Sequence, residues 1–186
     1  MNYSGFASLK LTTATFDELK LNKGIFVCLL HAKRIPPHIG IIINSQFHSL
    51  TIKGAEPNVS VKALLKTISQ RQIETIILKV VSHPVYSLDH LDAIFLEILK
   101  KYPVIKSNEV TCLSPIKEFF NEYYALGSYQ EEIIFSFLNK LNNNSFILEA
   151  YSLNLTIGNN SVEIPLYSQS ELSDKIKTIR EEYYND

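Results

Sequence analysis

Some stretches of this chain have the spacing of hydrophobic residues that is typical of strands, and others have the spacing that is typical of helices. Short apolar runs that are rich in β-branched residues and bounded by turn residues predict strands. Such runs occupy residues 25–30, 38–43, 47–52 and 75–81. Two further stretches, 146–155 and 161–166, flank Gly158-Asn159-Asn160, a turn sequence that predicts a hairpin.

Apolar residues that recur every three or four positions predict helices between these strands. The clearest helix is capped by Ser87, and its apolar stripe consists of Leu88, Leu91, Ile94, Phe95, Ile98 and Leu99. The same period predicts helices over 60–69, 113–124 and 130–141. Two capping-box patterns, Thr15 to Glu18 and Ser168 to Glu171, predict a short early helix and a charged last helix that ends near Tyr184.

Strands and helices thus follow one another in mixed order, without a regular strand–helix–strand repeat. This order predicts an α+β fold, with an antiparallel or mixed β-sheet and helices packed against it. No linker divides the sequence, so we expect one domain over residues 1–186. The sequence also lacks a glycine-rich phosphate loop, a dinucleotide-binding fingerprint and a zinc-protease motif.

Composition narrows the classes of protein to which the chain can belong. The 186 residues are 46% hydrophobic and 20% charged, with a formal net charge of −1, so no basic surface is expected to attract nucleic acid. The most apolar stretch, residues 24–32, is too short for a transmembrane segment, and no signal peptide is evident. We therefore expect a cytoplasmic protein with its two cysteines reduced; its many Asn, Ile and Lys residues are typical of a bacterial source.

Candidate chemistry begins with two histidines near one predicted hairpin. His38 opens an otherwise apolar strand, and His48 follows on the returning strand. If residues 44–46 form a three-residue turn, Ile42 lies opposite His48, and both imidazoles share one face because side chains alternate along a strand. Gly40 would then leave room between them for a third group. A two-residue turn would instead place the rings on opposite faces.

The third group is Cys112, which comes directly before a predicted helix. Unpaired N–H groups and a partial positive charge at a helix N-terminus stabilise a thiolate and can bind an oxyanion. If Ser114 caps the helix and Pro115 is its first residue, Cys112 lies just outside the first turn. A thiol beside an oriented imidazole is the arrangement of nucleophilic cysteine catalysis.

This order of residues resembles the circularly permuted papain-like thiol hydrolases, a group that includes lecithin:retinol acyltransferase-like enzymes. The likeness covers about residues 24–125: a His-x-Gly strand, a short turn, a second His, a strand and helix, then a Cys at a helix start. It implies a permuted papain-like fold, completed by residues 129–186, with Cys112 as nucleophile, His38 as base and His48 as the residue that orients it. The group often has Asn before the Cys, whereas this chain has Thr111.

By this resemblance the chain would be a thiol-dependent hydrolase or acyltransferase acting on an amide or an ester, with neither a metal nor another cofactor. The substrate, whether a small molecule, a lipid or a peptide, and the oligomeric state stay open. Ser49 or Thr51 is an alternative orienting residue. The set His38, His48 and Cys112 is also compatible with zinc, but a zinc site would need a fourth ligand or a bound water.

Simpler interpretations exist for each residue. Cys112 is spaced with apolar residues of its helix and suits packing in a core, as does Cys28 inside an apolar strand. His31, His83 and His90 have no partner pattern. The alternative function is a non-catalytic protein-binding or immunity-type module, for which the tyrosine pairs Tyr123-Tyr124 and Tyr183-Tyr184 are the candidate contact residues.

Overall fold

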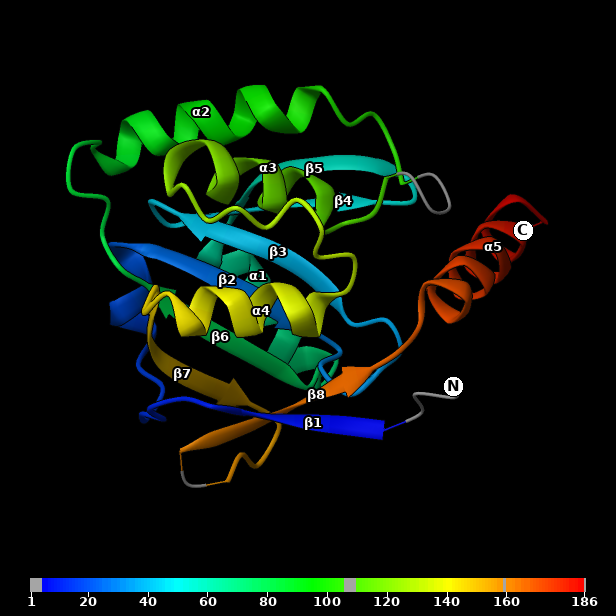
Figure 1. Cartoon of the computed structure of the whole chain (residues 1–186), viewed down its shortest axis with the longest axis horizontal. Coiled ribbons are helices and arrows are strands. Elements are labelled where there is room, and N and C mark those ends of the chain that lie inside the picture. The colour runs from blue at the N-terminus through cyan, green and yellow to red at the C-terminus, as the bar shows by residue number, and fades with distance from the viewer. Residues whose placement is uncertain (1–4, 106–109, 159, 186) are drawn as a thin grey trace.

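A computed structural model describes residues 5–105, 110–158 and 160–185, and over these residues the chain has the expected α+β architecture. A six-stranded antiparallel sheet has the order β5-β4-β3-β2-β6-β7, and a separate two-stranded sheet pairs β1 with β8 (Figure 1). The strands are β1 Gly5–Lys10, β2 Ile25–Leu30, β3 His38–Ile43, β4 Gln46–Thr51, β5 Gly54–Ser60, β6 Thr75–Val80, β7 Ile147–Leu153 and β8 Ser161–Leu166.

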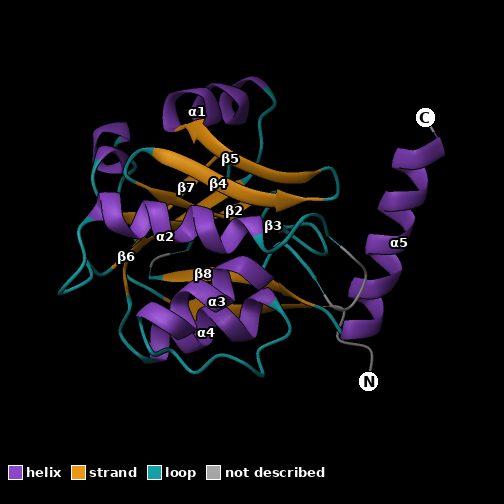
Figure 2. Cartoon of the chain, turned by 90° about the horizontal axis from the view of Figure 1, so that it is seen from above, coloured by secondary structure: helices purple, strands orange, loops and turns teal. Residues whose placement is uncertain are grey.

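The helices cover both faces of the larger sheet. α1 lies on one face, while α2, α3 and α4 lie on the other (Figures 1 and 2). The helices are the 3₁₀ helix η1 Glu18–Asn22, then α1 Val61–Gln70, α2 Leu88–Lys100, α3 Ser114–Tyr123, α4 Ile134–Asn143 and α5 Gln169–Asn185. None of the helices in the described part of the chain is both long and apolar enough to cross a bilayer.

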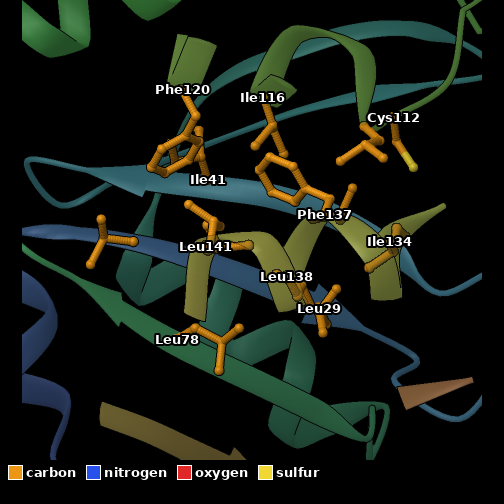
Figure 3. Close-up of a cluster of buried hydrophobic side chains, with 14 of the residues drawn as sticks. Leu29, Ile41, Leu78, Cys112, Ile116, Phe120, Ile134, Phe137, Leu138 and Leu141 are labelled. Atoms are coloured by element: carbon orange, nitrogen blue, oxygen red, sulfur yellow. The ribbon is translucent and has the colours of Figure 1, made fainter. Parts of the chain in front are cut away.

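Side chains of the central strands divide between two apolar cores. Ile39, Ile41 and Ile43 join the core under α2, α3 and α4, a part of which is drawn in Figure 3. Ile42 and Phe47 join the smaller core under α1. Because both faces of β2 and β3 are covered, nearly every position in these strands is apolar, and the strands show no alternation of apolar and polar residues.

Three of the expected helix starts are confirmed. The hydroxyls of Ser60 and Ser87 accept hydrogen bonds from the N–H groups of Ala63 and His90 at the starts of α1 and α2. Ser168 and Glu171 form a reciprocal capping box at the start of α5. The early helix differs from the prediction, because Asp17 rather than Thr15 caps it and its five residues form a 3₁₀ helix.

The turn between β3 and β4 contains two residues, not the three that we expected. Ile43 pairs with Gln46, Ile42 with Phe47 and Ile41 with His48. Asn44 and Ser45 have φ of 50° and 66°, the left-handed backbone that a tight hairpin needs to match the twist of its strands. This register reverses the expected facing of His48 relative to His38.

The expected hairpin near the C-terminus is also absent. β7 instead extends the large sheet by pairing with β6, and β8 pairs with β1. β8 leads directly into α5, which projects beyond the end of both sheets (Figure 1). The first two turns of α5 still contact the body, since Leu172 and Ile176 are buried.

Candidate functional site

A pocket of about 210 Å³ lies where β3 begins and β4 ends. His38 and Thr51 line it from the sheet, Cys112 from the segment before α3, and Leu172 and Ile176 from α5. Most of the remaining wall is apolar. The fold therefore brings together two of the three predicted site residues, His38 and Cys112, although more than seventy positions separate them in the sequence.

Cys112 lies just outside α3, because Leu113 occupies the N-cap position and Ser114 begins the helix. Its side chain is at one edge of the large apolar core, beyond Ile116 (Figure 3), and only 9% of the residue is exposed. Burial raises the pKa of the thiol, while the backbone N–H groups of Ile39, Leu113 and Cys112 itself act in the opposite direction. The expected lowering of the pKa by the helix N-terminus is thus wrong, because burial outweighs these N–H groups.

His38 is the first residue of β3 and is partly buried. Burial, and to a lesser degree the nearby His31, lowers the pKa of His38 to about 4, so its imidazole is neutral near pH 7. Among the described residues no hydrogen bond reaches this ring. The ring belongs to the same face of β3 as Gly40, the face toward α1, and meets the Cys112 pocket only because the strand ends here.

His48 is fully buried on the opposite face, where its Nε2 lies 2.8 Å from Oδ1 of Asp92 in α2. Its Nδ1 accepts a hydrogen bond of 3.1 Å from the backbone N–H of Asn58, so the ring proton is on Nε2 and is donated to Asp92. Burial lowers the pKa of His48 more than Asp92 raises it. The expected orientation of His38 by His48 is therefore wrong, and the physical reason is the two-residue turn.

Sequence reasoning did not find Asp92, the partner of His48. A signal was present, because Asp92 follows Leu88 by four positions and precedes Phe95 by three, which places a carboxylate on the apolar stripe of α2. A charge in such a position usually has a buried polar partner. Here that partner is an imidazole on the sheet.

The alternative orienting residues do not bond His38 either. Thr51 Oγ1 donates to the carbonyl of Gly54, and Ser49 Oγ is buried without a hydrogen-bond partner among the described residues. The zinc set is not assembled, since over the same part of the chain no three His, Cys, Asp or Glu side chains are grouped to hold a metal ion. Cys28 lies in the core as expected, and burial raises its pKa to about 12.

Comparison of the chain with protein-family models, curated proteins and solved structures finds no match. The chemistry of the Cys112 pocket is therefore inferred from its own residues. These supply a protonated thiol, a neutral imidazole, three backbone N–H groups around the sulfur and an apolar wall.

Proposed function

We propose that the chain is a thiol-dependent hydrolase or acyltransferase in which Cys112 is the nucleophile and His38 the base. The observation that carries this proposal is the shared pocket of the two residues. The Cys112 thiol also faces the N–H of Ile39, the residue next to His38. The proposal keeps the resemblance to permuted papain-like enzymes, but reduces the expected triad to a pair.

The reaction would start from a neutral thiol and a neutral imidazole. As Sγ of Cys112 bonds to the carbonyl carbon of an amide or ester, its proton passes to His38. His38 then protonates the leaving amine or alcohol as its bond to the carbonyl carbon breaks, which leaves a thioester on Cys112. Water or an acceptor then attacks the carbonyl carbon of the thioester and gives a proton to His38. The bond between this carbon and Sγ breaks, and His38 passes the new proton to the sulfur.

Two features of the pocket support acyl chemistry. The N–H of Cys112 lies beside the sulfur and could donate to an oxyanion formed there, whereas the N–H of Leu113 already donates to Oγ1 of Thr111. The apolar side chains of Leu172 and Ile176 suit the acyl part of a substrate rather than a charged group. We place this activity in the cytoplasm, where the thiol stays reduced.

The test is acylation of the intact protein by p-nitrophenyl butyrate, followed by release of p-nitrophenolate and by intact-protein mass spectrometry. We expect one butyryl group on Cys112, and none in Cys112→Ala. His38→Asn should slow acylation by about 10²-fold or more, the usual contribution of a general base.

A matched control is His31→Asn, which changes the other imidazole near His38 without touching the Cys112 pocket. It should acylate within a few-fold of the unchanged protein. Equal rates for His38→Asn and His31→Asn would reject His38 as the base, and acylation that persists in Cys112→Ala would reject the nucleophile.

A second candidate function, protein binding, is favoured by the loop before α2. Val85 is 78% exposed and Tyr86 39% exposed, and the N–H groups of both residues donate to Nδ1 of His83. Tyr124, which the sequence suggested as a contact residue, is buried, and the side chains of Tyr183 and Tyr184 lie outside the described residues. Sedimentation velocity tests the simplest case, since Val85→Asp should abolish any self-association through this loop.

A further inference from the structure

We propose that a second pocket, between the sheet and α1, binds a small uncharged molecule that carries a carboxamide group. This pocket has a volume of about 350 Å³, in the range of about 300–1,000 Å³ that is typical of small-molecule sites. His38 and Thr51 line both pockets, but Cys112 lines only the first, so binding in the second pocket does not require the thiol.

Successive elements of the fold build the walls. Phe47, Ser49 and Thr51 alternate along β4 and form the floor, because they share the face toward α1. Leu64 and Thr67 of α1 cover this floor. His31 and His38 close one end of the pocket and Glu56 of β5 stands at the other, so polar groups surround an apolar centre.

Ser49 is the residue that points to a ligand. It is 2% exposed, and its Oγ has no hydrogen-bond partner among the described residues. Neighbouring hydroxyls do not share this condition, since Thr51 donates to Gly54 and Thr67 donates to Ala63. A buried hydroxyl normally has a hydrogen-bond partner. The unsatisfied hydroxyl of Ser49, in the wall of a pocket, therefore indicates a bound polar group.

The groups around the pocket define the chemistry of that polar group. Ser49 can donate and accept, and the neutral ring of His38, whose pKa burial lowers, offers one N–H and one lone pair. The exposed carboxylate of Glu56 at the rim disfavours an anion. A carboxamide group meets all three conditions, because it is uncharged and has both a carbonyl oxygen and an N–H. Phe47 and Leu64 would pack against the apolar part of the ligand that carries this group.

The test uses benzamide as the probe in a ¹H–¹⁵N NMR titration of the whole chain. We expect saturable shifts centred on the amides of Ser49, Leu64 and Thr67, with a dissociation constant in about the millimolar range for so small a molecule. Ser49→Ala should weaken binding by about tenfold through loss of one buried hydrogen bond. Because that hydroxyl has no partner, the variant should fold normally.

Four controls make the result decisive. Ser8→Ala, an exposed serine on β1, and Cys112→Ala should both bind benzamide as tightly as the unchanged chain, and the latter separates this pocket from the thiol site. Thr67→Tyr should block binding by filling the pocket from α1. Benzoate, which has the same shape with a negative charge, should bind at least several-fold more weakly. Absence of saturable shifts at Ser49, or equal binding by Ser49→Ala, would overturn the proposal.

Discussion

Nε2 of His48 and Oδ1 of Asp92 lie 2.8 Å apart and join the centre of β4 to α2 across the larger core. The other nitrogen of the same ring accepts the N–H of Asn58, where the pairing of β4 with β5 is shifted by a bulge. One buried imidazole therefore connects a helix, a strand and the irregular part of an edge strand. This role explains a fully buried histidine without any part in catalysis.

The contact predicts a loss of stability when Asp92 is truncated. Asp92→Ala leaves the Nε2–H of His48 buried without an acceptor, and we expect the free energy of unfolding to fall by about 1–3 kcal/mol. Urea denaturation followed by circular dichroism measures the change. Asp92→Asn, which retains an acceptor oxygen, should lose less.

A carboxylate on the exposed side of α2 provides the comparison. Asp89 accepts a 2.6 Å hydrogen bond from the side chain of Asn44, but the contact is open to solvent. Asp89→Ala should therefore cost under about 1 kcal/mol. A cost for Asp89→Ala equal to that for Asp92→Ala would contradict the structural role of the His48 contact.

Buried histidines also predict how stability depends on pH. The folded-state pKa values of His38, His48 and His31 lie below the ordinary value of 6.5, with burial as the largest cause for each. Below pH 6.5 the unfolded chain therefore binds more protons than the folded chain, so the free energy of unfolding falls as pH decreases. We expect a plateau above about pH 7 and a decline from about 6.5 toward 4, measured by urea denaturation at each pH.

His38 should carry a large share of that decline. A shift of its pKa from 6.5 to about 4 corresponds to at most about 3 kcal/mol between pH 7 and pH 4. His38→Asn should flatten the profile by part of this amount. An unaltered slope in His38→Asn would mean that the imidazole is protonated as easily in the folded state as in the unfolded one.

Gly40 is expected to tolerate no side chain. A Cβ at this position would lie 2.3 Å from the ring of Phe47 and 2.9 Å from the carbonyl oxygen of His48. Gly40→Ala should therefore destabilise the fold by about 1–3 kcal/mol, the usual cost of overpacking. Gly5→Ala, where nothing lies within 4 Å, is the control, and Phe47→Leu should partly rescue Gly40→Ala if the ring clash is the cause.

The sequence predicted the elements whose burial is reflected in their pattern of apolar residues. Strands were predicted over residues 25–30, 38–43 and 75–81 because helices cover both faces of the sheet at β2, β3 and β6 and leave near-continuous apolar runs. β5 was missed because this edge strand, Gly54–Ser60, is largely exposed, polar and interrupted by Pro57. The separation of β7 from β8 was missed because their partners, β6 and β1, are distant in the sequence.

The candidate site was also predicted only in part from the sequence. The sequence order suggested that Cys112 and His38 approach one another, and the two residues do line one pocket. The face on which His48 lies depended on whether the turn before it has two or three residues. The local sequence specifies this length only weakly, and a change of one residue moves every later side chain of the strand to the opposite face. The pKa of Cys112 depended on its depth in the core, a property that no local motif encodes.

The C-terminal helix α5 is expected to control access to Cys112. Leu172 and Ile176 are buried against the pocket that contains the thiol, whereas Ile179, one turn further along, is 41% exposed. Ile176→Asn introduces a polar side chain into this contact, so the first turns of α5 should separate from the body more often. Labelling of Cys112 by iodoacetamide should then accelerate by on the order of tenfold, because local opening sets the access of the reagent to a buried group.

Mass spectrometry of tryptic peptides measures the labelling of each cysteine separately, and Cys28, fully buried in the core under α1, reports on global unfolding in the same sample. Thr178→Asn places the same new side chain on the exposed side of α5 and should leave the rate unchanged. Faster labelling of both cysteines would indicate general destabilisation rather than opening of the helix. If Cys112 in Ile176→Asn is labelled no faster than in the unchanged protein, α5 does not limit the access of iodoacetamide to the thiol.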